Sequence, residues 1–73
     1  MKALLWTKKS CPYCVQAKEL LTNKGIQFEE RVIGEGLTRE QLLESVPTAK
    51  TVPQIFLGEE YVGGYTDLKA KIG

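Results

Sequence analysis

Residues 2–32 decide the fold, and they read KALLWTKKSCPYCVQAKELLTNKGIQFEERV. Residues 2–6 form a short, mostly apolar run without a glycine or proline, which predicts a buried strand that leads into a polar loop. Apolar and polar side chains alternate over residues 26–32, as expected of a second strand with one polar side. The residues between these two runs have a different period, so the stretch predicts two strands joined by another element.

The segment between the two strands has the period of a helix. Cys14, Ala17 and Leu21 recur at intervals of about three to four residues, which places them on one helical face. Pro12 suits the first turn, where its missing N–H costs nothing, and Gly25 suits the position just after the last turn. A strand, a crossover helix and a second strand predict a right-handed pair of parallel strands.

The second half of the chain predicts two further helices. Thr38 and Gln41 have the spacing of a capping box and open a helix that runs through about Val46. Near the C-terminus, a threonine and an aspartate at residues 66 and 67 are able to cap a last helix of under two turns, over residues 68–72. Together with the helix between the first two strands, these two helices bring the number of predicted helices to three.

A tight hairpin is predicted between those two helices. Residues 54–57 and 60–62 read as strands, and Gly58 and Glu59 separate them. Glycine at the first loop position is the signal of a type II′ turn. The hairpin adds antiparallel neighbours to the parallel pair, so the whole chain predicts an α/β fold with one mixed sheet and helices packed on it.

The composition limits both the number of domains and the chemistry. The chain has 73 residues, about half of what one domain uses on average, so we expect a single domain over residues 1–73. It contains two cysteines, Cys11 and Cys14, and no histidine, which excludes Ser-His-Asp and Cys-His catalytic groups and Cys2His2 zinc sites. Two thiolates alone cannot complete the tetrahedral coordination shell of a zinc ion. A disulfide that closes a loop of only about four residues stabilises a fold weakly. The pair is therefore expected to serve chemistry, with no tightly bound cofactor.

The charges of the chain are balanced. Ten Lys and Arg against nine Asp and Glu leave a net charge of +1, without a basic run long enough for a nucleic-acid surface. The apolar run at residues 3–6 is far too short for a signal peptide or a membrane span, so we expect a cytoplasmic protein without a membrane partner. In that compartment a CxxC pair is more often catalytic or metal-binding than structural.

The two sulfurs of the CPYC turn are expected to have unequal roles. Cys11 ends the loop after the first strand and lies at the helix N-terminus, where unpaired N–H groups and the helix dipole stabilise a thiolate. Its thiol should titrate below the free-cysteine value of about 8.5, and Lys8 can add positive potential. Cys14 lies one turn into the helix, on its inward face. Cys11 is then the accessible sulfur that attacks a substrate disulfide, and Cys14 resolves the mixed disulfide.

Three motifs follow one another along the chain. They are Cys11-Pro12-Tyr13-Cys14, TVPQIF at residues 51–56 and GGYTDL at residues 63–68. In this order and spacing they resemble the glutaredoxin family, and the resemblance covers nearly the whole chain. It implies a thioredoxin-like α/β fold, with a four-stranded mixed sheet (β-α-β-α-β-β-α) flanked by three helices. It also implies a redox-active disulfide and glutathione as co-substrate in the reduction of protein disulfides and of glutathionylated proteins.

The resemblance further implies a glutathione site built from three parts of the chain. Residues 52–53 match a loop whose proline is cis and whose backbone pairs with the cysteine of glutathione. Residues 64–67 match the site of the γ-glutamyl group, whose carboxylate suits a helix N-terminus while Asp67 takes the ammonium. Lys8 matches a lysine near the glycine carboxylate, and Tyr13 a tyrosine that packs against the peptide. The expected glutathione contacts are Lys8, Tyr13, Thr51, Val52, Pro53, Gly64, Thr66 and Asp67.

Two alternatives to this function stay open. One is a glutaredoxin-like redoxin reduced by thioredoxin reductase, although such relatives tend to lack a site of the Thr66-Asp67 type. The other is a binding module in which two chains hold an iron–sulfur cluster through Cys11 and two glutathiones, which a proline after that cysteine disfavours. By resemblance, ribonucleotide reductase is a plausible protein substrate, and we expect a monomer. Arg39 or Gln41 is a further candidate for the glycine carboxylate of glutathione.

Overall fold

The chain folds into a four-stranded mixed sheet flanked by three helices, which confirms the predicted fold class. The computed structural model describes residues 2–73. Within them the elements are β1 (Lys2–Lys8), α1 (Pro12–Asn23), β2 (Gln27–Ile33), α2 (Arg39–Ser45), β3 (Gln54–Leu57), β4 (Glu60–Gly63) and α3 (Tyr65–Ile72). The order of elements is therefore the predicted β-α-β-α-β-β-α.

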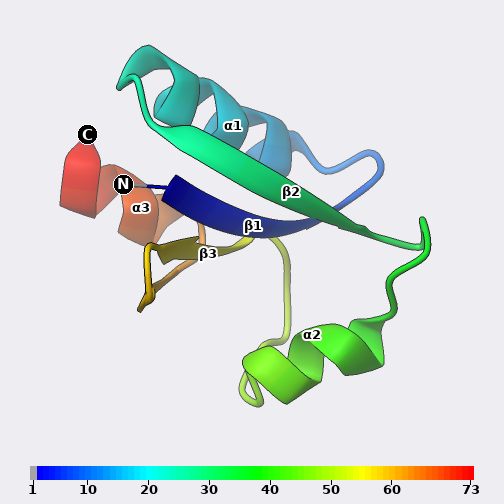
Figure 1. Cartoon of the computed structure of the whole chain (residues 1–73). Coiled ribbons are helices and arrows are strands. Elements are labelled where there is room, and N and C mark those ends of the chain that lie inside the picture. Colours follow the sequence, from blue (N-terminus) through cyan, green and yellow to red (C-terminus); the bar gives the residue numbers. More distant parts are fainter. Residues whose placement is uncertain (1) are drawn as a thin grey trace.

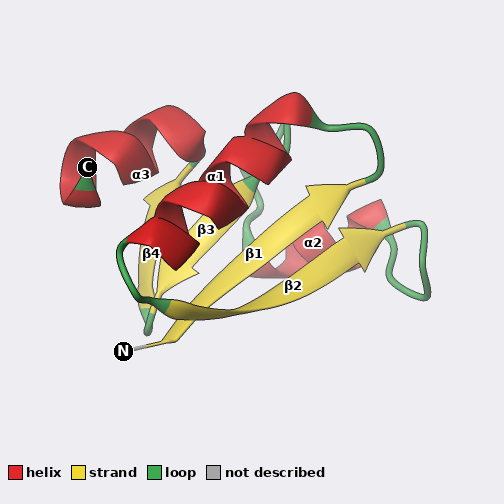
Figure 2. Cartoon of the chain, turned by 90° about the horizontal axis from the view of Figure 1, so that it is seen from above, coloured by secondary structure: helices red, strands yellow, loops and turns green. Residues whose placement is uncertain are grey.

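The sheet has the strand order β2-β1-β3-β4. β1 and β2 run parallel, whereas β3 is antiparallel to both β1 and β4. Trp6 near the end of β1 is paired with Gln54 at the start of β3, so the loop after β1 and the loop before β3 meet at one edge of the sheet. Helices α1 and α3 lie on one face of the sheet and α2 on the other (Figure 1, Figure 2).

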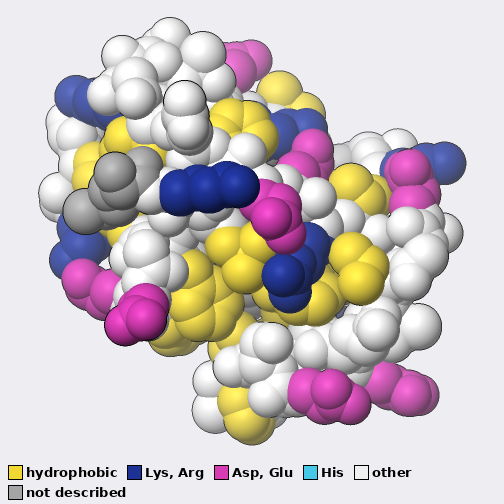
Figure 3. Space-filling model, in the orientation of Figure 1, with side chains coloured by type: hydrophobic (Ala, Val, Ile, Leu, Met, Phe, Trp, Pro, Cys, Tyr) yellow, Lys and Arg dark blue, Asp and Glu magenta, His cyan; other side chains and the backbone are white. Residues whose placement is uncertain are grey.

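Two apolar clusters hold these layers together. Between the sheet and the α1–α3 pair, Leu5, Leu21, Ile55 and Leu68 are each fully buried. Such burial stabilises the fold by about 1.5–3 kcal/mol for each large side chain. On the other face, Trp6 packs against residues of α2 and of the segment that follows it. Figure 3 shows apolar side chains in the hollow between the sheet and α2, so this helix covers its face only in part.

Both ends of α1 are fixed by local interactions. Cys11 is the N-cap, with an extended backbone, and Pro12 takes the first helical position, as predicted. Beyond the last turn, Gly25 adopts a left-handed φ of +71°, which costs glycine little. The N–H groups of Gly25 and Ile26 donate to carbonyls of the last turn at 3.0 and 2.9 Å, which is a Schellman motif. The helix that carries the cysteines is therefore anchored at both ends.

The capping box of α2 and the hairpin turn also form as predicted. Gln41 N–H donates to Thr38 Oγ1 at 3.2 Å, and Thr38 N–H donates to Gln41 Oε1 at 2.8 Å. In the hairpin, Gly58 has a φ of +61°, whereas Glu59 is not among the residues with positive φ. This combination fits the type II′ turn, because a type I′ turn requires positive φ at both loop positions.

Strand β1 is longer than the sequence pattern indicates. It continues through Thr7 and Lys8, which we expected in the loop, and both residues are in register with the end of β2. Thr7 is fully buried, and its hydroxyl donates to the Glu30 carboxylate at 2.7 Å. A polar residue therefore extends the strand because a partner on β2 satisfies its hydroxyl.

Helix α3 begins earlier than predicted. Gly64 is its N-cap, so Thr66 and Asp67 lie inside the first turn instead of before it. The Asp67 carboxylate accepts the Gly64 N–H at 3.1 Å and caps the helix from within. The earlier start gives α3 eight residues, a little more than two turns at about 3.6 residues per turn.

Candidate functional site

The CPYC turn holds a disulfide between Cys11 and Cys14 in the first turn of α1. Their Cα atoms lie 5.2 Å apart, and the Cys14 N–H donates to Cys11 Sγ at 3.2 Å. Backbone donors and the helix dipole at this end stabilise negative charge on Cys11 Sγ once the disulfide is reduced. The expected position of Cys11 at the helix N-terminus is confirmed.

The two cysteines differ in their access to solvent, but less than expected. Cys11 is 7% exposed and Cys14 is 2% exposed, so both are largely buried in the oxidised chain. Cys14 lies on the inward face of α1 with Ala17 and Leu21, as its spacing predicts. A substrate sulfur therefore has to enter beside Cys11, within a cavity and not on an open surface.

A loop from the second half of the chain lies against Cys11. The peptide bond between Val52 and Pro53 is cis, as the family resemblance implies. Cys11 Sγ lies 3.8 Å from the carbonyl oxygen of Val52, although 41 residues separate the two in the sequence. The backbone before β3 is therefore next to Cys11 Sγ, where an extended peptide is able to pair with it.

One cavity of about 190 Å³, the first cavity, extends from this loop to the start of α3. It brings together seven of the residues expected to contact glutathione, and their binding role stays a prediction. The cavity is lined by Tyr13, Thr51, Val52, Pro53, Gly64, Tyr65, Thr66 and Asp67. Tyr65 was not among the expected contacts, although its place between the double glycine and Thr66 could have indicated it.

The aromatic wall of the first cavity is a pair of tyrosines. The rings of Tyr13 and Tyr65 are stacked, with their centroids 6.0 Å apart. Tyr13 is 60% exposed, so one face of this pair is open to a bound molecule. Aromatic rings of this kind give a peptide substrate an apolar surface at low entropic cost.

Asp67 shapes the far end of the first cavity. One of its carboxylate oxygens caps Gly64, so the second oxygen remains for a ligand. Gly63, just before the helix, has a φ of +119°, and a Cβ there would lie 2.5 Å from Asp67 Oδ2. The double glycine therefore allows the carboxylate to reach the backbone of the helix N-terminus.

A second cavity of about 380 Å³ shares Thr51 and Val52 with the first and, unlike the first, is lined by Cys11. Lys8, Arg39 and Lys50 line it, and within residues 2–73 none of these three forms an ion pair. It suits an anionic group placed close to the sulfur. Lys8 and Arg39 therefore line one cavity with Cys11, and their contact with the glycine carboxylate of glutathione stays a prediction.

Two neighbouring residues have other contacts. Gln41 uses its side chain to cap α2 and does not line the second cavity, so the structure favours Arg39 over Gln41 as the further candidate. Lys9 pairs with Glu35 at 3.7 Å and has a side chain that is 78% exposed. It faces solvent at the mouth of the site.

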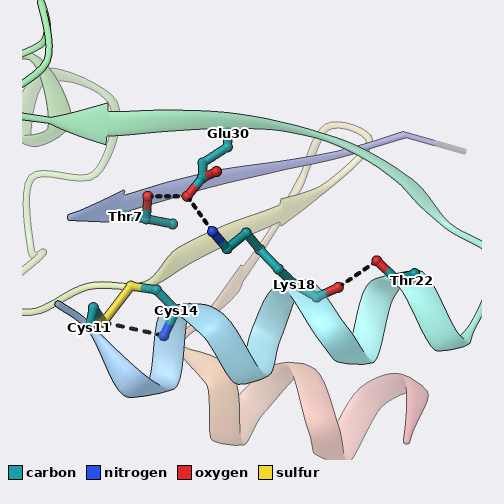
Figure 4. Close-up of polar contacts among 6 residues, drawn as sticks. All are labelled: Thr7, Cys11, Cys14, Lys18, Thr22 and Glu30. Carbon is teal, nitrogen blue, oxygen red and sulfur yellow. Dashed lines mark hydrogen bonds and ion pairs between the residues drawn. A yellow bond between two sulfur atoms is a disulfide. The ribbon is translucent and has the colours of Figure 1, made fainter. Parts of the chain in front are cut away.

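A charged cluster missed by the sequence patterns lies beside the cysteines. The Glu30 carboxylate accepts the Thr7 hydroxyl at 2.7 Å and pairs with Lys18 Nζ at 3.0 Å, and Figure 4 shows these three residues with the disulfide. Partial burial acts to raise the pKa of the Glu30 carboxyl. The hydrogen bonds from Thr7 and Lys18 and the positive charge of Lys18 lower this pKa, and together they outweigh the effect of burial. The net pKa lies below the ordinary value, so Glu30 is an anion at neutral pH. The sequence signal for this cluster was the position of Glu30 on the side of β2 that faces the helix.

This pKa shift predicts a contribution of Glu30 to acid stability. Because its pKa is lower in the folded than in the unfolded chain, unfolding takes up a proton once the pH falls below the ordinary glutamate range. Denaturant unfolding at a series of acidic pH values should show stability falling through that window. Glu30→Gln should flatten this part of the profile, whereas Glu59→Gln, in the exposed hairpin turn, should not. Equal slopes in wild type and Glu30→Gln would contradict the assignment.

Residues 2–73 contain neither a long apolar helix nor a cluster of metal-ligating side chains. No helix there is long and apolar enough to cross a membrane. The same residues contain no group of three or more His, Cys, Asp or Glu side chains placed to hold a metal ion.

Comparisons with known proteins point to one family. The family model described as glutaredoxin matches residues 3–62. Glutaredoxin 3 of Escherichia coli strain K12 is 43% identical over 67 residues, which cover 90% of this chain and 80% of that protein. The hybrid peroxiredoxin hyPrx5 of Haemophilus influenzae is 42% identical over 65 residues, and the match covers 89% of this chain but only 27% of that longer protein.

Solved structures give the same result. Glutaredoxin 1 from Francisella tularensis, complexed with cacodylate, matches with a TM-score of 0.83 and 35% identity, over 96% of this chain and 90% of that one. A buckwheat glutaredoxin–glutathione complex matches with a TM-score of 0.75 and 25% identity, over 94% of this chain and 66% of that one. The fold is therefore shared with glutaredoxins of solved structure.

Proposed function

The chain belongs to the glutaredoxin family, whose members are thiol–disulfide oxidoreductases, and we propose that glutathione is its electron donor. The observation that carries the proposal is the first cavity, which joins the Val52–Pro53 loop beside Cys11 to the start of α3. The buckwheat relative, a glutaredoxin–glutathione complex, supports the same ligand. The protein would reduce glutathione mixed disulfides and protein disulfides through its CPYC dithiol.

The two ends of the first cavity fit the two ends of a γ-glutamyl cysteine unit. The γ-glutamyl group carries one ammonium and one carboxylate on the same carbon. The free Asp67 oxygen suits the ammonium, and the N–H groups that begin α3 suit the carboxylate. The backbone of Val52 would pair with the cysteine residue between them, which brings its sulfur to Cys11.

The second cavity fits the remaining part of glutathione. Its glycine carboxylate would lie near Lys8 and Arg39, two cations without an ion-pair partner in the described chain. Both charges also favour the thiolate of Cys11, since opposite charges nearby lower the pKa of a thiol. The helix N-terminus and these cations would together stabilise the Cys11 thiolate in a chain that contains no histidine.

The reaction follows from thiol–disulfide exchange at Cys11. The Cys11 thiolate attacks the mixed disulfide of a glutathionylated protein and releases the protein thiol. A second glutathione then attacks Cys11-bound glutathione, and glutathione disulfide leaves. With a protein disulfide, Cys14 clears the mixed disulfide instead. We propose that the chain works as a monomer in the cytosol, where glutathione is kept reduced, with ribonucleotide reductase as one candidate protein substrate.

Asp67→Asn is the sharpest test of the glutathione site. Asparagine keeps an oxygen for the Gly64 N–H but removes the charge that pairs with the ammonium, so the KM for glutathione should rise about tenfold with little change in kcat. Glu59→Gln, which removes an exposed charge from the hairpin turn, is the matched control and should leave KM unchanged. Steady-state reduction of a small glutathione mixed disulfide measures both variants.

The same assay separates the proposal from its alternative. Wild-type protein should turn over with glutathione and glutathione reductase. If glutathione gave no turnover while thioredoxin reductase restored it, the chain would be a glutaredoxin-like redoxin with another electron donor. An unchanged KM in Asp67→Asn, together with normal wild-type turnover, would instead move the γ-glutamyl site elsewhere.

A further inference from the structure

A third cavity of about 620 Å³ borders the cysteines and contains none of the first cavity's lining residues. Both Cys11 and Cys14 line it, whereas Cys14 lines neither of the two cavities assigned to glutathione. Lys18 of α1 and Glu30 of β2 line the same space. The third cavity shares Lys8 and Cys11 with the second, but of the three cavities it alone is lined by Cys14, Lys18 and Glu30.

This pair is the least exposed of the ion pairs within residues 2–73. Its side chains are 33% and 28% exposed. The Glu30 carboxylate also accepts the hydroxyl of Thr7, which is fully buried. Partly buried charges are screened less by solvent than exposed ones, so this pair acts on its neighbours at longer range.

Cys14 lines the same cavity as this pair. Lys18 follows Cys14 by four residues on α1, which places the two on the same helical face. Figure 4 shows the Glu30 carboxylate between Thr7 and the Lys18 amine, beside the helix turns that carry the disulfide. The other charges around the third cavity are Lys8 and the exposed Lys9–Glu35 pair. No acid besides Glu30 and Glu35 lines it.

We propose that Glu30 and Lys18 are positioning residues that set the proton affinity of Cys14 in the resolving step. In that step Cys14 loses its proton to solvent in the third cavity. Its thiolate attacks Cys11 Sγ, the bond from Cys11 to the partner sulfur breaks, and the partner leaves as a thiolate. Over the first attack by Cys11 and this resolving step together, the two sulfurs of the substrate disulfide gain two electrons and the Cys11–Cys14 pair loses two. The inference rests on the proposed dithiol reaction, but the protonation of Cys14 is measurable without glutathione.

The two charges should shift the Cys14 thiol in opposite directions. Without the Glu30 charge, Lys18 favours the thiolate and the pKa of Cys14 falls. Without the Lys18 charge, Glu30 disfavours the thiolate and the pKa rises. Each shift should be about one pKa unit, because both charges line the same partly hydrated cavity as Cys14. A merely structural role would move both variants in the same direction, towards an unperturbed thiol.

The experiment is a titration of Cys14 in a Cys11→Ser background, where it is the single thiol. Thiolate absorbance in the ultraviolet is followed against pH for this parent and for the parent with Glu30→Gln, with Lys18→Met, or with both. Glu30→Gln should lower the pKa, Lys18→Met should raise it, and the double variant should return close to the parent. Circular dichroism at each pH confirms that the chain is folded.

Lys2 and Glu29 provide the matched control. They form an ion pair at 3.9 Å, and Glu29 sits next to Glu30 on β2 but on the opposite face of the strand. Glu29→Gln and Lys2→Met should leave the titration of Cys14 unchanged. Shifts of the same sign in Glu30→Gln and Lys18→Met, no shift in either, or equal shifts in the controls would each overturn the proposal. If Glu30→Gln does not fold, Lys18→Met alone must still raise the pKa.

Discussion

Replacing Cys11 by serine should abolish turnover of glutathione mixed disulfides and of protein disulfides alike. We expect a loss of at least about a thousandfold, because a serine hydroxyl does not ionise at neutral pH and is no nucleophile for a disulfide. Cys11 is the N-cap of α1, where a serine oxygen accepts the Cys14 N–H as the sulfur does. The variant should therefore keep its fold, and glutathione-coupled turnover measures the loss.

Cys14→Ser is the control for that experiment. It keeps the attacking sulfur, so it should retain reduction of glutathione mixed disulfides and lose most of its activity on protein disulfides. Two outcomes would contradict the assignment of roles. One is substantial turnover in Cys11→Ser, and the other is equal loss of both activities in Cys14→Ser.

Gly63→Ala should have the largest effect on stability among single changes at the site. The backbone at Gly63 has a φ of +119°, and holding alanine there costs about 1–3 kcal/mol. The new Cβ would also lie 2.5 Å from Asp67 Oδ2, so the carboxylate has to leave the Gly64 N–H and the cap of α3 is weakened. We expect a total loss of roughly 2–4 kcal/mol in denaturant unfolding.

Gly36→Ala separates the two causes. Gly36 also has a positive φ, of +87°, but a Cβ there meets no atom within 4 Å. This variant should lose only the conformational part of the stability and keep the wild-type KM for glutathione. Gly63→Ala should raise that KM as well, because it displaces Asp67. Equal stability losses in the two variants would show that the collision with Asp67 has no energetic weight.

The fold could be predicted from local patterns because each pattern has one structural solution. The period of α1, the glycine at its end and the capping box of α2 are short-range signals, and the structure satisfies each of them. The wrong boundary of β1 depends on a contact across the chain. Thr7 is part of β1 because Glu30 accepts its hydroxyl, and no signal near Thr7 in the sequence announces that partner.

The site could be predicted only in part for a similar reason. The unequal positions of Cys11 and Cys14 follow from where the helix starts, so the local sequence was enough to predict them. The proximity of Val52 to Cys11 depends on the antiparallel register of β1 and β3, and only the family resemblance indicated it. Glu30 escaped both approaches, because a single acid on a strand of mixed polarity looks like a solvent-facing residue until its partners are seen.

The antiparallel pairing of β1 with β3 also leaves one end of the molecule free for engineering. All three parts of the site, at Cys11, Val52 and Asp67, lie where β1 and β4 end and β3 begins. The hairpin turn at Gly58 is at the other end of β3, four residues away, or roughly 13 Å along the strand. A fluorophore or an affinity tag attached at the exposed Glu59 would report on this protein, or immobilise it, without meeting its substrates.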